Sequence, residues 1–438
     1  MPDTDATKRR RTVSWVVALS TIALVFDGYD LVVYGTVLPT LLADPAQLGA
    51  LSPAEAGSLG SYALVGVLVG ALAAGSLGDW IGRRRIMLIN LAWFSIGMGA
   101  TALTQNVTAF GVGRFVTGIG VGALVATVGA LVAEFAPPGQ RNRLNAMVYS
   151  GVPAGGVLAA VLAIVLADAI GWRGLFWIGA LPIVLVLPLA VMKLPESPRW
   201  LASRGRLEQA RALAERTGVP LAAEPPVTGR VGFPALASRA LALPTVLLGL
   251  MSFAGLLLTY GLNTWLPKIM QDGGYGEGYS LAFLLILNLG AIVGGLLASL
   301  WADRIGAKRV VATTFVLAAS TLALLPLGLP FGALLLAVAV AGVGTIGTQV
   351  LIYGLVSHYY PTRARAAGVA WCAGFGRLGG IVGPVIGGLL VGAGLGGTTA
   401  FHVFAGIALA AALVTGLVPR SRHADAELPV AGAAAHPA

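Results

Sequence analysis

The chain has 438 residues, of which 57% are hydrophobic and only 11% charged, and its mean hydropathy is +0.86. A soluble domain carries roughly a quarter charged residues, so this composition excludes an ordinary soluble protein. The formal net charge is +10. The single cysteine, Cys372, excludes an internal disulfide bond and a metal site built from cysteines.

Apolar stretches of about 20 residues, the length that spans a bilayer, recur along the whole chain. Twelve can be counted, which predicts an all-α membrane protein with twelve transmembrane helices in two six-helix bundles. The stretches lie near residues 14–40, 54–78, 85–104, 107–136, 143–168, 174–193, 244–270, 279–301, 308–327, 330–358, 365–392 and 398–418.

The positive charges predict how these helices are oriented. If the N-terminus is cytoplasmic, 24 of the 28 Lys and Arg residues fall in segments on the cytoplasmic side. Positive charge retained in cytoplasmic loops orients membrane proteins, so we expect both termini inside and a multi-pass location in the plasma (inner) membrane. No nucleic-acid partner is then needed to explain the basic charge. The polar residues 1–11 run straight into the first stretch, which predicts that no signal peptide is cleaved.

The first stretch contains two carboxylates, in the sequence Asp27-Gly28-Tyr29-Asp30. A charged side chain near the bilayer centre costs about 2.5–3.5 kcal/mol on insertion scales, so it is rarely without a function. The two acids are spaced i and i+3 and share one helix face, which Tyr34 extends by a turn. Close carboxylates cannot easily both ionise, which predicts a proton site. A purely structural pair is the alternative.

A polar, proline-containing break at residues 194–243 separates the first six stretches from the last six. We therefore expect an N-terminal bundle at 1–193, a cytoplasmic central loop at 194–243 and a C-terminal bundle at 244–419. The Ala/Pro-rich residues 420–438 are expected to form a disordered cytoplasmic tail.

The two halves repeat each other in sequence: residues 78–85 recur, with changes, 224 residues later at 302–309. Repeated halves with the substrate site at their interface are typical of secondary transporters. The buried charges are not repeated, which indicates specialised roles. At offsets of 228 and 224 residues, Asp27, Asp30, Arg114 and Glu134 correspond to Gly255, Leu258, Val338 and His358. Arg377 is the second half's own intramembrane cation.

Several motifs resemble those of one transporter superfamily. The loop Gly75-x-x-x-Asp79-x-x-Gly82-Arg83-Arg84, the later Gly113-Arg114 and the sequence from Pro195 to Trp200 resemble signatures of the major facilitator superfamily. Within it, Asp27-Gly28-x-Asp30 and Tyr360-Pro361-Thr362-Arg363-x-Arg365, followed by Gly376-Arg377, are similar to motifs of the aromatic acid:proton symporter family.

This resemblance implies the major facilitator fold and proton-coupled import of a small aromatic carboxylate, of the hydroxybenzoate or benzoate type, by alternating access. It implies functional roles for Asp27, Asp30, Arg114, Glu134, Arg365 and Arg377. Two loop residues depart from the pattern, because Trp80 and Ala307 stand where basic residues are usual. Residues 379–388 resemble a glycine and proline pattern associated with antiporters. We interpret it as a close-packing surface, although proton-driven export of drugs or metabolites stays open.

Counting from the helix ends at 1.5 Å per residue places Asp27 and Arg377 roughly 20 and 16 Å from the inner surface, near mid-membrane. We expect Arg377 to bind the substrate carboxylate, because a guanidinium offers two parallel donors. A pair with an aspartate that only holds helices together is the alternative. Arg114 fits equally well a substrate contact or a pair with Asp30 that tunes proton coupling. Further substrate-binding candidates are Tyr34, Tyr260, Asn263, Trp265, Tyr353 and Trp371.

Residues near the predicted cytoplasmic mouth are expected to form a gating network, with solvated loop charges as the alternative. They are Asp79, Gly82, Arg83, Glu134, Arg141, Asp303 and Arg365. We find no phosphate loop, metal-ligand cluster or hydrolase triad, so we expect neither an enzyme nor a cofactor, and a proton gradient as the energy source. The expected partners are an aromatic acid, protons and the lipid bilayer, and the expected state is a monomer. A symporter for another organic acid and a receptor that senses the acid remain alternatives.

Overall fold

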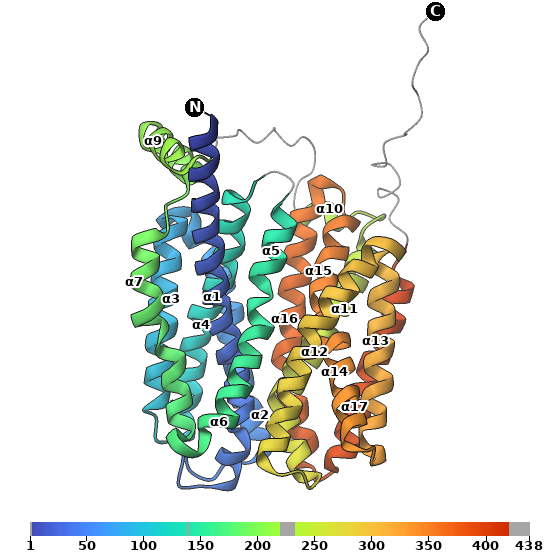
Figure 1. The fold of residues 1–438 in the computed structure, drawn as a ribbon. Coiled ribbons are helices and arrows are strands. Elements are labelled where there is room, and N and C mark those ends of the chain that lie inside the picture. Colours follow the sequence, from blue (N-terminus) through green and yellow to red (C-terminus); the bar gives the residue numbers. More distant parts are fainter. Residues whose placement is uncertain (1, 138–139, 220–232, 420–438) are drawn as a thin grey trace, which may run out of the picture.

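A computed structural model describes residues 2–137, 140–219 and 233–419. Every regular element within these ranges is a helix (Figure 1). Eleven helical stretches are long and apolar enough to cross a membrane. The predicted all-α fold is therefore confirmed. The predicted tail at 420–438 lies outside the described residues.

The first half begins with a long helix, α1 (Pro2–Ala43), which starts well before the predicted span. Its extension is supported by α9, which packs against it. The next helix starts at a capping box, in which Ser52 and Glu55 satisfy each other's backbone N–H groups. The remaining helices are α2 (Pro53–Ile81), α3 (Arg83–Ala102), α4 (Val107–Phe135), α5 (Arg141–Tyr149), α6 (Gly151–Ala180) and α7 (Pro182–Lys193).

One apolar stretch, Arg143–Lys193, is 51 residues long, more than twice the length that a bilayer requires. It is interrupted at Gly171, whose φ of 64° lies in the left-handed region that favours glycine. The chain turns back on itself within α6, as Figure 1 shows.

Three short helices, α8 (Pro198–Ser203), α9 (Leu207–Thr217) and α10 (Phe233–Leu236), lie between the halves in sequence. The second half contains an interrupted span in which a π-helical turn, η2, separates two α-helices. Its elements are α11 (Ala242–Asp272), α12 (Glu277–Ile305), α13 (Ala307–Leu324), η1 (Leu325–Leu327), α14 (Phe331–Gly342), η2 (Val343–Gly347), α15 (Thr348–Tyr359), α16 (Thr362–Gly392) and α17 (Gly396–Leu417).

The two halves meet mainly along three helix pairs: α2 with α16, α6 with α12, and α1 with α11. In the first pair the backbones are very close, because a Cβ atom at Gly57 would lie 2.5 Å from the carbonyl oxygen of Pro384. Ser61 Oγ donates to the carbonyl oxygen of Ile381 at 2.5 Å. This contact lies near the start of α2, at the end of the molecule away from α9 (Figure 1). The glycine and proline pattern at 379–388 thus takes part in helix packing.

Candidate functional site

The first of two buried charge sites joins α1 to α4. Arg114 Nη1 forms an ion pair with Asp30 Oδ1, and Arg114 Nη2 donates to the backbone oxygen of Asp30 at 3.4 Å. Both residues are almost fully shielded from solvent. The guanidinium also lies 5.5 Å from the ring centroid of Tyr34 and 5.8 Å from that of Phe176, within the range of cation–π attraction. Arg114 therefore has its counter-charge within the first half.

Asp27 lies one helical turn before Asp30 but has a different environment. Its side chain is buried, and its Oδ1 atom has no hydrogen-bond partner among the described residues. The charges of Arg377 and Asp30 both act on it. An incompletely paired carboxylate is costly to keep ionised in an apolar surrounding. Asp30 also keeps one unpaired oxygen, Oδ2, but its Oδ1 is ion-paired with Arg114, so Asp27 is the less satisfied of the two acids.

Arg377 of α16 forms the second charge site together with Asp27. Its charge acts on Asp27 and Tyr149 of the first half and on Tyr260 and Tyr353 of the second. The side chain is partly buried, and within the described residues its guanidinium has neither a hydrogen bond nor an ion pair. Five N–H donors are thus available for an anion at a point where both halves contribute side chains.

Two of the predicted substrate-binding residues, Tyr260 and Tyr353, lie in this cluster around Arg377. Asn263 lies instead in a polar contact between α11 and α12. It donates to the carbonyl oxygen of Thr259 at 2.7 Å and accepts from Asn288 Nδ2 at 2.9 Å. Its amide is therefore engaged in packing in this conformation.

The other three predicted substrate-binding residues use their polar atoms to hold helices together. The Tyr34 hydroxyl donates to the carbonyl oxygen of Ala56 at 2.6 Å. The indole N–H groups of Trp265 and Trp371 donate to the carbonyl oxygens of Pro384 and Thr245, at 2.8 and 3.0 Å. Trp371 also stacks on Phe375, with ring centroids 5.2 Å apart. These residues shape the surroundings of the site, and their contact with substrate stays a prediction.

Sequence reasoning missed Tyr149, which belongs to the Arg377 cluster. The signal was the polar pair Tyr149-Ser150 within the predicted stretch at 143–168. Gln349 of α15 is a further polar residue buried in the second half. Its Nε2 donates to Ser252 Oγ at 3.1 Å, whereas its Oε1 is buried and has no hydrogen-bond partner among the described residues.

Of the predicted gating residues, the structure brings Arg83 and Glu134 into contact. Arg83 Nε lies 3.2 Å from Glu134 Oε1, which links α3 to α4. Gly82 separates α2 from α3 with a φ of 112°, a conformation that side chains rarely adopt. Asp303 is exposed, and Arg365 is partly buried with its Nε unpaired among the described groups. The side chains of Asp79 and Arg141 lie outside the described part of the structure. No group of metal-ligating side chains occurs among the described residues.

Comparison with known proteins agrees with this architecture. Residues 16–229 match the family "Sugar (and other) transporter", and residues 280–437 match the Major Facilitator Superfamily. The inward open conformation of the xylose transporter XylE from E. coli superimposes with a TM-score of 0.74 at 19% sequence identity, covering 94% of this chain and 97% of that one. This likeness shows the fold.

Proteins related in sequence identify the family more narrowly than the shared fold does. The gentisate transporter of Corynebacterium glutamicum is 35% identical, covering 91% of this chain and 85% of the relative. The benzoate transport protein of Acinetobacter baylyi is 32% identical, with 86% and 83% covered. The 4-hydroxybenzoate transporter PcaK of Pseudomonas aeruginosa is 31% identical, with 94% of each covered. The chain is therefore a multi-pass membrane transporter, not an enzyme, and belongs to the aromatic acid symporter family of the major facilitator superfamily.

Proposed function

We propose that this transporter imports a small aromatic carboxylate, of the hydroxybenzoate or benzoate type, together with protons. The observation that carries the proposal is the juxtaposition of Arg377, whose donors are free among the described residues, with the incompletely paired Asp27 of the other half. A guanidinium is suited to binding a planar carboxylate through two parallel hydrogen bonds. The names of the relatives, which transport gentisate, benzoate and 4-hydroxybenzoate, support an aromatic ring.

The topology that we propose has twelve membrane crossings. Dividing the long stretch Arg143–Lys193 at Gly171 turns eleven candidate spans into twelve. An even number returns the chain to the side on which it started, and the distribution of positive charges supports the cytoplasm as that side. The proposed location is the plasma (inner) membrane, with the protein as a monomer that needs no cofactor.

The coupling that we propose follows from charge balance at Arg377. Without substrate, Arg377 and an ionised Asp27 compensate each other. A bound substrate carboxylate pairs with the guanidinium of Arg377. The site then holds two negative charges, on the substrate and Asp27, and one positive charge, on Arg377. A proton on Asp27 removes the excess, so substrate and proton bind better together than separately. Asp30 keeps Arg114 as its partner throughout, which holds the second acid close to Asp27.

The energetics favour this coupling. A monoanion that enters against an interior-negative potential opposes about 2.3 kcal/mol per 100 mV. One cotransported proton cancels that term and adds the pH gradient. We further propose that Arg83 and Glu134, with the other predicted gating residues, close the end on the α9 side when the halves separate at the opposite end. The contacts at Gly57 and Ser61 are the ones that would have to open.

Uptake into proteoliposomes tests the proposal. Labelled 4-hydroxybenzoate, benzoate, protocatechuate and gentisate are supplied outside at acidic pH, with an ionophore that collapses the proton gradient as the control. We expect at least one acid to accumulate, and the ionophore to abolish its accumulation. Accumulation only under the reversed gradient would indicate export, and saturable binding without accumulation would indicate a receptor. Accumulation only of non-aromatic acids would indicate a symporter for another organic acid.

A further inference from the structure

A second basic site lies away from the transport cluster, at the end of the bundle where α2, α3 and α8 meet. A cavity of about 400 Å³ is lined by Trp80, Ile81, Arg85, Trp200, Arg204 and Arg206. Three of its six lining residues are arginines, and none is acidic. Within the described residues, the side chains of Arg85 and Arg206 have neither a hydrogen bond nor an ion pair. The guanidinium groups of Arg85 and Arg206 are thus available to a ligand.

The walls of this cavity are held in place by specific contacts. Arg204 Nη2 donates to the carbonyl oxygen of Trp80 at 3.1 Å, which fixes the segment after α8 to the end of α2. Glu196, which precedes α8, also holds the start of α3, because its Oε1 accepts the backbone N–H of Arg84 at 2.9 Å. Gly82, at the junction of α2 and α3, has a φ of 112°, a conformation that favours glycine, and it lies beside the carboxylate of Glu196. The arginines are therefore gathered before any ligand arrives.

An exposed apolar strip leads away from the cavity along the membrane-facing side of α2 and α3. Trp80 itself is 71% exposed, although it stands at a position where the loop motif usually has a basic residue. The strip consists of Val69, Leu72, Leu77 and Trp80 on α2 and Ile89, Trp93 and Ile96 on α3. On α2 most of these residues recur at helical spacing and so lie on one face. Tryptophan side chains favour the boundary between headgroups and hydrocarbon, which places the cavity at headgroup depth.

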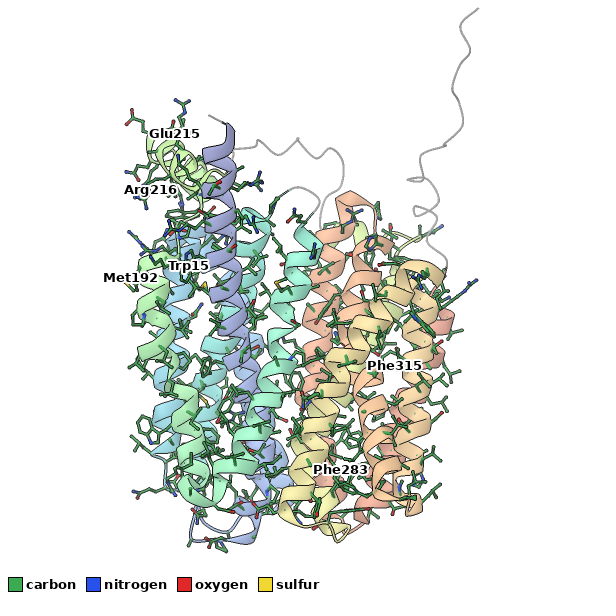
Figure 2. All side chains as sticks on the ribbon, in the orientation of Figure 1. Trp15, Met192, Glu215, Arg216, Phe283 and Phe315 are labelled. Atoms are coloured by element: carbon green, nitrogen blue, oxygen red, sulfur yellow. The ribbon has the colours of Figure 1, made fainter. Side chains whose placement is uncertain are left out.

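We propose that this cavity binds the headgroup of an anionic phospholipid of the phosphatidylglycerol type, from the leaflet on the α9 side. Arg85 and Arg206 bind the phosphate, for which their planar guanidinium groups are suited. The acyl chains of the lipid lie along the exposed apolar strip of α2 and α3. A free phosphate ion would make no contact with this strip. Basic pockets at the ends of membrane helices recognise anionic headgroups in this way. Figure 2 shows α9, with Glu215 and Arg216, projecting beyond the same end of the bundle. This site is separate from the proposed transport function and does not depend on it.

Lipid binding to the purified full-length protein in detergent tests this proposal. Phosphatidylglycerol is titrated and the bound lipid is counted by native mass spectrometry. The double variant Arg85→Gln/Arg206→Gln should bind it roughly 30-fold more weakly, given about 1 kcal/mol per basic residue near the surface. The matched control is Arg304→Gln/Arg309→Gln, in the repeated loop of the second half, where Arg309 corresponds to Arg85. It should bind as the wild type does.

Three results would overturn the proposal. Equal losses in the two double variants would mean that general surface charge attracts the lipid. Phosphatidylethanolamine binding as tightly as phosphatidylglycerol would mean that the headgroup charge is not recognised. Displacement of the lipid by millimolar inorganic phosphate would identify a free phosphate site. If the double variant unfolds, Arg206→Gln alone, which lies outside the membrane helices, should still weaken binding roughly fivefold.

Discussion

The two acids of α1 lie one helical turn apart, yet one belongs to a closed charge site and the other to an open one. Asp30 is paired with Arg114 inside the first half, and aromatic rings enclose the pair. Asp27 has no ion pair among the described residues, and the charge that acts most strongly to stabilise its ionised form, that of Arg377, comes from the other half. The difference indicates that the charge of Asp30 is held in place by one half alone, whereas a charge balanced across the halves can respond to ligand and to movement.

Removing Arg114 should have the largest effect, because it leaves Asp30 buried without its partner. Breaking a buried pair by deleting one member typically costs 3–5 kcal/mol. We expect Arg114→Ala to lower the unfolding temperature in detergent markedly and to reduce the yield of folded protein. The double variant Asp30→Asn/Arg114→Gln should recover much of this stability but no proton-driven accumulation. A fully stable Arg114→Ala would show that the site is not closed in the way described.

Replacing each acid by asparagine should show that Asp27 and Asp30 have different effects on transport and stability. Asp27→Asn should abolish proton-driven accumulation but retain exchange of substrate for substrate, because exchange need not release a proton. Its stability should change by less than about 1 kcal/mol, since an unpaired oxygen is lost. Asp30→Asn should also abolish accumulation and should in addition destabilise the protein, because Arg114 loses its partner. Asp30→Glu should be milder. If both asparagine variants still concentrate the substrate nearly as well as the wild type does, the two acids have only a structural role.

Arg377 should control affinity rather than stability. Removing one partner of a buried charged interaction costs 2–5 kcal/mol, so Arg377→Ala should raise the apparent binding constant for the acid by roughly 30-fold or more. Arg377→Lys should recover only part of the loss, because an ammonium lacks the planar fork. The benzamide analogue serves as the control and should lose little. Equal losses for acid and amide would mean that Arg377 supports the fold, and Arg114 would become the leading carboxylate ligand.

The smallest effect is expected where the halves are joined without charge. Ser61→Ala removes the hydrogen bond to the carbonyl oxygen of Ile381 between α2 and α16. If this hydrogen bond contributes a net free energy of about 1 kcal/mol, its loss shifts the equilibrium roughly fivefold toward conformations in which the halves are separated at the end away from α9. Spin labels on the first turns of α2 and the last turns of α16, in a Cys372→Ser background, would report the distance change. Ser95→Ala, whose hydroxyl bonds only within α3, is the control and should not shift the distance.

Much of the fold could be predicted from the sequence, because bilayer thickness sets the length of each apolar stretch. The turn at Gly171 falls between the predicted stretches 143–168 and 174–193. The start of α1 could not be predicted, because its polar first turns are supported by α9, about 200 residues away in sequence. The repeat singled out Asp27 and Arg377, since neither has a charged counterpart in the other half.

The pairing within the site was beyond sequence reasoning. The choice of Arg114 between Asp30 and a substrate depends on how α1 and α4 are rotated against each other, which no spacing along one helix reveals. Aromatic residues were equally ambiguous. Trp265 is buried and binds the carbonyl oxygen of Pro384, whereas Tyr353 lies near Arg377, yet both appear in the sequence as aromatic residues within apolar stretches.

The π-helical turn η2 has a consequence for how such a site can change in evolution. A π turn accommodates one residue more than an α turn, so α15 is rotated by about 100° relative to an uninterrupted continuation of α14. Tyr353 and Gln349 reach the Arg377 cluster with that rotation in place. A single-residue deletion within Val343–Gly347 would therefore exchange the face that α15 presents while leaving every side chain of the cluster in the sequence. Deletion of one codon, rather than a set of substitutions, is thus enough to change which side chains of α15 surround Arg377.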